Sequence, residues 1–105
     1  MDVQLKRGLL DICVLKILTR GDSYGYQIVK DVSDIIPISE STLYPILKRL
    51  ESSECLEVYT VEHNGRLRKY FKITAKGYNK ISEFIEDFQQ VIDIMEIIKE
   101  EEDER

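Results

Sequence analysis

The chain has 105 residues, of which 43% are hydrophobic and 33% charged, and its formal net charge is −5 at pH 7. This composition indicates one small globular domain and excludes a disordered or fibrous protein. The longest uncharged runs have seven residues, whereas a membrane span needs about 18 apolar residues, so no membrane contact is expected. The N-terminus lacks the basic-then-apolar order of a signal peptide, and the expected location is cytoplasmic.

The negative charge is concentrated in the last third of the chain. Residues 1–74 carry 11 Lys/Arg and 10 Asp/Glu, whereas residues 75–105 carry 4 and 10. The net charge therefore does not prevent the first segment from presenting a local basic patch.

The first predicted helix covers residues 5–18. Between Leu9 and Leu18 only Asp11 and Lys16 are polar, so the helix is apolar nearly all round. Such a helix is covered on two sides, and in so small a domain the second cover is expected to be another subunit. Gly21 is the expected C-terminal cap.

Two short helices are predicted next, over residues 24–35 and 39–52. Asp22 or Ser23 is expected to cap the earlier helix, and Ser39 the later one. Pro45 lies beyond the first turn of the later helix, where proline removes a hydrogen bond, so a local bend or an irregular first turn is expected. The outer face of this helix is expected to carry Ser41, Thr42, Tyr44, Lys48 and Arg49.

A β-hairpin is predicted over residues 56–73. Apolar and polar residues alternate in both halves, and Asn64-Gly65 between them is the strongest short hairpin signal because both residues tolerate positive φ. The second strand carries four cations in seven residues, from Arg66 to Lys72. These cations are either a solvated strand face or, beside the third helix, contacts to phosphate.

The last predicted helix begins after Thr74, which is the expected cap, and continues to about Lys99. Its apolar residues follow a heptad pattern over nearly three heptads, which is typical of a helix that pairs with another helix. The charged residues 100–105 are expected to fray. The seam residues are Ile81, Phe84, Phe88, Val91, Met95 and Ile98.

This order of elements predicts an α+β, mostly α fold: a winged helix-turn-helix of three helices and a two-stranded wing, with a long C-terminal dimerisation helix. Residues 1–74 form the predicted DNA-binding domain, and residues 75–105 the dimerisation helix with its acidic end. Hydroxyl, aromatic and cationic side chains on the third helix and the wing suit base edges and phosphates. The candidate DNA-binding residues are Ser39, Ser41, Thr42, Tyr44, Lys48, Arg49, Asn64, Gly65, Arg66, Arg68 and Lys69.

The same reasoning gives a candidate dimer interface formed by the first and last helices. Phe84 and Phe88 lie one turn apart on the seam, and two readings of them remain open: dimer packing, or a cleft for a small aromatic effector. The candidate dimerisation residues are Leu5, Leu9, Ile12, Ile81, Phe84, Phe88, Val91, Met95 and Ile98.

Three strings of residues resemble the PadR family of bacterial transcriptional regulators. They are Gly25-Tyr26-Gln27-Ile28, the run Ser41-Thr42-Leu43-Tyr44-Pro45-Ile46-Leu47-Lys48-Arg49-Leu50-Glu51, and the run from Arg68 to Gly77. The resemblance covers residues 5–80 and implies a winged helix whose last helix crosses the partner subunit. Where the family has Glu-Gly-Leu-Ile, this chain has Ser53-Glu54-Cys55-Leu56, which puts the geometry of that turn in question.

The residues predict no catalytic set, cofactor or metal site. His63, the one histidine, lies beside the hairpin turn, where it is either solvated or has a phosphate or pH role. Cys13 and Cys55 lack a metal-binding spacing and are expected to be buried, reduced thiols.

Two functions from different classes follow. The first is a cytoplasmic, homodimeric repressor that binds a palindromic operator and is released by an aromatic effector. The alternative is a winged-helix protein-interaction module without an operator of its own. The cations of the hairpin favour DNA binding.

Overall fold

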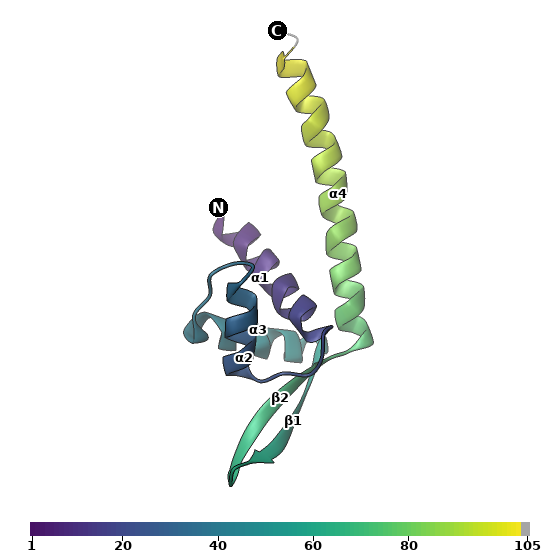
Figure 1. The fold of residues 1–105 in the computed structure, drawn as a ribbon. Helices are drawn as coiled ribbons and strands as arrows, with labels where there is room; N and C mark the ends of the chain where they lie inside the picture. Colours follow the sequence, from purple (N-terminus) through teal and green to yellow (C-terminus); the bar gives the residue numbers. More distant parts are fainter. Residues whose placement is uncertain (104–105) are drawn as a thin grey trace.

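The computed structural model describes residues 1–103, with side chains to residue 100. It contains four helices and one two-stranded antiparallel sheet, in the predicted order (Figure 1). The mostly helical α+β class is therefore confirmed. The elements are α1 (Val3–Leu18), α2 (Gly25–Ser33), α3 (Glu40–Ser52), β1 (Leu56–His63), β2 (Arg66–Ile73) and α4 (Ala75–Asp103).

The core lies where α1, α2 and α3 meet the base of the hairpin. α1 supplies five buried apolar residues, and Leu56, Phe71 and Ile73 close the core from the hairpin. The nearly uniform apolar character of α1 follows from its contacts with both this core and α4. Part of the second cover, which was expected to come from another subunit, is therefore α4 of the same chain. The largest fully buried side chains are Val14, Leu15, Leu18, Ile28, Val32, Leu43, Leu47 and Leu50.

The segment before α2 differs from the prediction that Asp22 or Ser23 caps this helix. The N-cap residue is Tyr24, which makes no side-chain capping bond. The backbone of Ser23 instead pairs with Phe71 of β2: each amide donates to the other's carbonyl, at 3.2 and 2.7 Å. Asp22 accepts a hydrogen bond from the Tyr59 hydroxyl. The segment is thus held by the hairpin rather than by the helix that follows it.

α3 begins as predicted. The Ser39 hydroxyl accepts a hydrogen bond from the Thr42 amide at 3.3 Å and so caps the helix. The Ser39 carbonyl accepts from the amides of both Thr42 and Leu43, which tightens the first turn. The helix then continues through Pro45 to Ser52.

The hairpin has the predicted turn. His63 pairs with Arg66, so Asn64-Gly65 forms a two-residue connection. Both residues have positive φ, 51° and 79°, as the twist of a two-residue hairpin requires.

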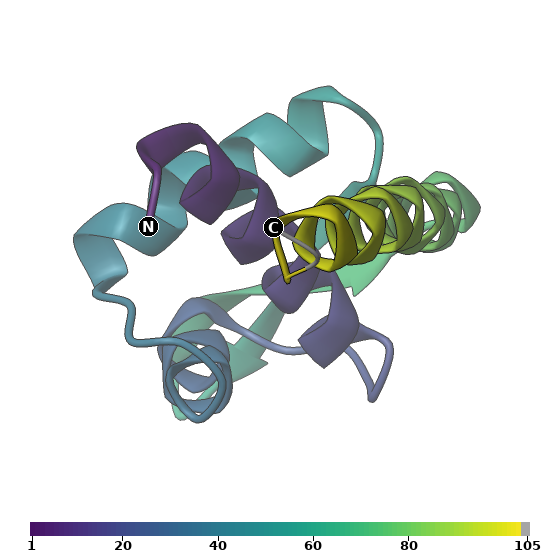
Figure 2. The same cartoon turned by 90° about the horizontal axis from the view of Figure 1, so that it is seen from above.

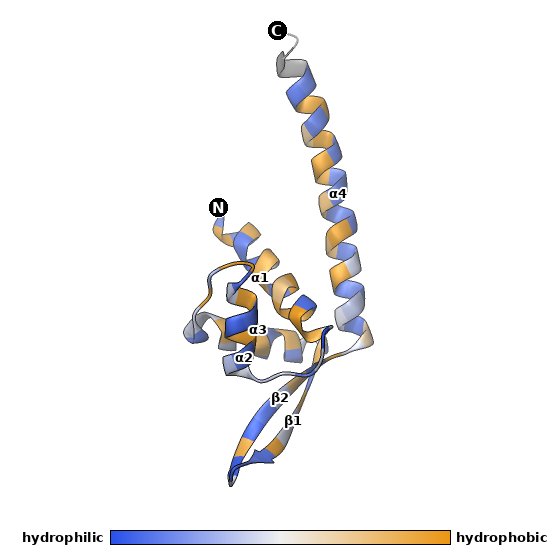
Figure 3. Ribbon diagram, in the orientation of Figure 1, coloured by the Kyte–Doolittle hydropathy of each residue, from blue (hydrophilic) through white to orange (hydrophobic). Residues whose placement is uncertain are grey.

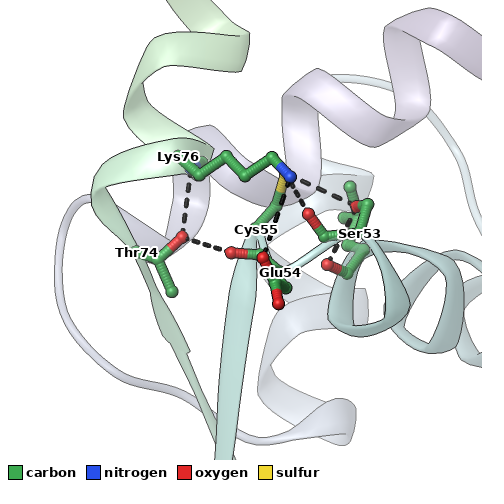
Figure 4. A network of polar contacts seen from close by, with 7 residues as sticks. Ser53, Glu54, Cys55, Thr74 and Lys76 are labelled. Carbon is green, nitrogen blue, oxygen red and sulfur yellow. Dashed lines mark hydrogen bonds and ion pairs between the residues drawn. The ribbon is translucent and has the colours of Figure 1, made fainter.

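A small polar network ties the end of α3 to the start of α4 (Figure 4). The Thr74 hydroxyl donates to the Glu54 carbonyl at 2.7 Å and accepts from the Gly77 amide at 3.2 Å, which confirms Thr74 as the cap of α4. Gly77 allows this close packing, since a Cβ there would lie 2.6 Å from the Cys55 carbonyl oxygen. Glu54 has a φ of 64°. This turn therefore keeps the left-handed backbone conformation that glycine adopts most easily, although its residue is Glu54.

α4 gives the molecule its elongated shape. At 29 residues it is about 43 Å long, and it projects well past the N-terminal end of α1 (Figures 1 and 2). The radius of gyration is 16.9 Å, against about 13 Å for a compact domain of this length. The helix passes the predicted end at Lys99 and reaches Asp103, and the last two residues of the expected frayed end lie outside the described residues.

Candidate nucleic-acid interface

The N-terminal half of α3 presents a cluster of hydroxyl groups to solvent. Ser39 Oγ lies 3.0 Å from Ser41 Oγ and 3.1 Å from Thr42 Oγ1, and all three residues are exposed. The opposite face of the helix is buried and consists of Leu43, Ile46, Leu47 and Leu50. The structure therefore brings the predicted hydroxyls together at the end of α3 that enters the major groove in helix-turn-helix proteins.

Tyr44 lies beside this cluster and leans over the start of α2. Its side chain is 52% exposed, yet a Cβ at Gly25 would lie only 2.9 Å from its hydroxyl. Gly25 thus leaves room for the ring, a role that the sequence analysis did not assign. The signal was present as the first residue of the Gly-Tyr-x-Ile string.

A hollow of about 690 Å³ joins α2, α3 and the hairpin. It gathers Tyr44 and Lys48 from α3 with Arg68 and Lys69 from β2, four residues that the sequence analysis assigned to DNA binding. Glu51 is the one carboxylate among the lining residues, so the lining carries a net positive charge. The other lining residues are Tyr24, Gly25, Tyr26, Leu47, Leu67 and Phe71.

Arg49, another predicted DNA contact, does not line this hollow. Its guanidinium donates to the Asp11 carboxylate of α1. Asp11 is only 8% exposed, and the pair lies between the two helices. Arg49 therefore lies at the boundary between the outer face of α3 and the α1 contact, with its side chain 32% exposed. Its DNA contact stays a prediction.

The hairpin divides its cations between two faces. Arg66 and Arg68 lie on the face of Tyr59 and Tyr70, while Lys69 lies on the other face, opposite Thr60. A second hollow, of about 490 Å³, lies at the tip and is lined by His63, Asn64, Arg66, Leu67 and Arg68. Asn64 and Gly65 form the turn itself.

The candidate dimerisation residues of α1 lie along its partly open side. Leu5 is exposed, whereas Leu9 and Ile12 are half-buried. α1 contacts α4, and apolar residues recur along the coloured part of α4 (Figure 3).

The seam of α4 divides into two parts. Ile81 packs on the core, and Phe84 lies near α1, since a Cβ at Gly8 would be 3.4 Å from its ring. The Phe84 and Phe88 rings stack with centroids 4.4 Å apart. Beyond them, Val91, Met95 and Ile98 are 47%, 50% and 52% exposed.

The described residues contain no group of three or more side chains able to hold a metal ion. Cys13 and Cys55 are both free thiols, and partial burial raises the pKa of Cys13. Within residues 1–103, no helix is both long enough and apolar enough to span a membrane.

Comparison with known proteins identifies the family. Residues 14–83 match the transcriptional regulator PadR-like family. The chain belongs to this family. It is also 34% identical, over 99 residues, to an uncharacterised protein of Lysinibacillus sphaericus; the match covers 90% of this chain and 91% of that protein.

Solved structures agree with the PadR-like assignment. A PadR family transcriptional regulator of Eggerthella lenta superposes with a TM-score of 0.82 at 34% identity, covering 93% of this chain and 88% of that one. A protein of Streptococcus mutans superposes with a TM-score of 0.75 at 38% identity, covering 90% and 89%. The predicted resemblance and the winged-helix fold are both confirmed, and the hairpin is the wing of this fold.

Proposed function

We propose that this PadR-like chain is a homodimeric repressor that binds a palindromic operator with α3 in the major groove and the wing on the adjacent backbone. The hollow that gathers Tyr44, Lys48, Arg68 and Lys69 carries the proposal. On this one surface, the Tyr44 side chain, which can contact base edges, lies next to cations that can contact phosphates. A repressor works on the chromosome, so the proposed location is the cytoplasm.

The exposed half of α4 supports the dimer. Val91, Met95 and Ile98 lie beyond the body of the domain, where a second subunit would remove them from water. Together with α1, such an interface would bury more than about 1,000 Å² of accessible surface, which is enough for a stable complex. In this proposal residues 1–74 bind DNA and residues 75–105 join the two subunits.

The proposal includes an effector site between the two subunits. Phe84 and Phe88 are half-buried and stacked beside α1. Each occurs twice in a dimer, so a flat aromatic molecule inserted between the pairs would change the angle between the two α4 helices and the spacing of the two α3 helices. Planar dyes should then bind the native dimer more tightly than a Phe88→Ala variant, as followed by tyrosine fluorescence; equal binding would leave the rings a packing role only.

The most direct test of operator binding compares two duplexes in a mobility-shift assay. One is the region upstream of the protein's own gene, and the other has the same composition in scrambled order. We expect preferential binding of the first duplex, and Tyr44→Phe should weaken that preference by about 1 kcal/mol per half-site if its hydroxyl reads a base. Equal losses on both duplexes would assign Tyr44 to the backbone. No shift with either duplex would favour the protein-interaction module.

A further inference from the structure

One cation of the wing rests on an aromatic ring from another element. The guanidinium carbon of Arg68, in β2, lies 4.0 Å from the centroid of the Tyr24 ring, which directly precedes α2. This distance is typical of a cation–π contact, in which the plane of the guanidinium can stack on the ring.

The contact is one end of a longer stack. The Tyr24 and Tyr70 rings meet edge to face with centroids 5.6 Å apart, and Tyr70 stacks on Tyr59 at 5.7 Å. The Tyr59 hydroxyl then donates to Asp22 at 2.6 Å. Both ends of the stack therefore return to the segment between α1 and α2, which is itself paired with β2 through Ser23.

Arg68 differs in this respect from the neighbouring cations. Among the described residues, the side chains of Arg66, Lys69 and Lys72 make no hydrogen bond, ion pair or aromatic contact that would hold them in one orientation. They are exposed, whereas Arg68 is half-buried against its ring. A free arginine loses side-chain entropy when it binds a phosphate, and a preorganised one loses less.

We infer that Tyr24 is a positioning residue for DNA binding, which holds the Arg68 guanidinium so that its N–H edges face the phosphate backbone beside the hollow. The inference rests on the proposed function and adds a residue that the sequence analysis did not consider. A contact that only stabilised the fold would leave DNA affinity unchanged once the variant had folded.

The test measures affinity for a random-sequence duplex of about 25–30 base pairs, which is long enough to contact both subunits of a dimer, over a series of salt concentrations. Tyr24→Leu should weaken binding about three- to tenfold for each subunit and leave the salt dependence unchanged, since no phosphate contact is lost. Tyr24→Phe keeps the ring and should bind like the native chain. Arg68→Ala removes one phosphate contact per subunit and should flatten the slope of log K against log salt by about 2.

Two further variants make the outcome decisive. In the Arg68→Ala background, Tyr24→Leu should cause no additional loss; additive losses would show that Tyr24 does not act through Arg68. Arg68→Lys keeps the charge without the planar stack, so it should weaken binding at an unchanged slope. This variant tests the inference even if Tyr24→Leu does not fold.

The failure of the inference is distinguishable from that of the proposed function. If native protein binds with a steep salt dependence and both Tyr24→Leu and Arg68→Lys bind equally well, only the positioning role is wrong. If native protein binds no duplex at low salt, both are wrong.

Discussion

Glu54 occupies a backbone conformation that glycine adopts without cost. Its φ of 64° lies in the left-handed region, which disfavours residues with a Cβ by about 1–2 kcal/mol. Its side chain contributes little in return, because the ion pair with Lys76 is exposed and 3.9 Å long.

Glu54→Gly should therefore stabilise the protein by about 0.5–1 kcal/mol, after the greater flexibility of unfolded glycine is subtracted. Urea unfolding at a fixed protein concentration measures this change. Glu54→Ala is the control, since it removes the carboxylate but keeps the strain, and it should give no gain. An equal gain in both variants would assign the effect to charge rather than to the backbone.

The ionisation of Tyr59 tests whether its hydrogen bond to Asp22, in the segment before α2, forms in solution. The hydrogen bond from its hydroxyl to Asp22 raises the pKa of Tyr59 above its ordinary value, with smaller contributions from desolvation and from nearby charges. The folded state favours the protonated hydroxyl, so this stabilisation is present at neutral pH and is lost as the pH rises through the raised pKa.

Absorbance titration of tyrosinate should show one tyrosine ionising above the ordinary range. In Asp22→Asn this upward shift should shrink, because the acceptor loses its charge. A titration that is identical in the two proteins would mean that the bond does not form in solution.

At the scale of elements, Asp11 and Arg49 join α1 to α3. Because the Asp11 side chain is only 12% exposed, removing its partner leaves a carboxylate without compensation. Arg49→Met should cost about 2 kcal/mol or more of unfolding free energy. The double variant Asp11→Leu/Arg49→Met should recover most of the loss, since apolar side chains of similar size can replace such a pair.

Urea unfolding of the native protein, both single variants and the double variant gives the coupling between the two residues. Additive losses would show that the ion pair has no stabilising role in solution.

The elements that could be predicted from the sequence are those set by local patterns. The Ser39 and Thr74 caps, the Asn64-Gly65 turn and the long helix α4 depend on neighbours within a few residues, and these predictions are confirmed. The pairing of the α4 heptads with another helix stays a prediction. The segment before α2 was wrongly predicted because Ser23 pairs with Phe71, far along the chain.

The predictions for the candidate site also divide into those set by local patterns and those set by distant contacts. The exposed hydroxyls of α3 follow from its periodicity. The pairing of Arg49 with Asp11 and the stacking of Arg68 on Tyr24 depend on contacts between elements distant in sequence. No spacing in the sequence indicates those contacts.

At the scale of the whole molecule, the proposed dimer would cover the projecting half of α4, whose residues Val91, Met95 and Ile98 are about half-exposed. Phe88→Glu would place a charge within the proposed seam, where burial without a partner is costly. We expect this variant to dissociate or unfold, as measured by light scattering and circular dichroism at micromolar concentration. Gln90→Glu adds the same charge on the opposite side of α4 and should remain dimeric. A native chain that is monomeric under these conditions would contradict the proposed dimer.

The salt dependence of DNA binding tests the central claim most directly, because it counts the phosphates that the wing and α3 neutralise together. If each subunit uses three or four of Lys48, Arg66, Arg68 and Lys69, a dimer neutralises about 6–8 phosphates, and log K should fall against log salt with a slope of about −5 to −7. A slope near zero for the native protein on its upstream duplex would contradict the account, since the surface that gathers these cations would then not be the one that meets DNA.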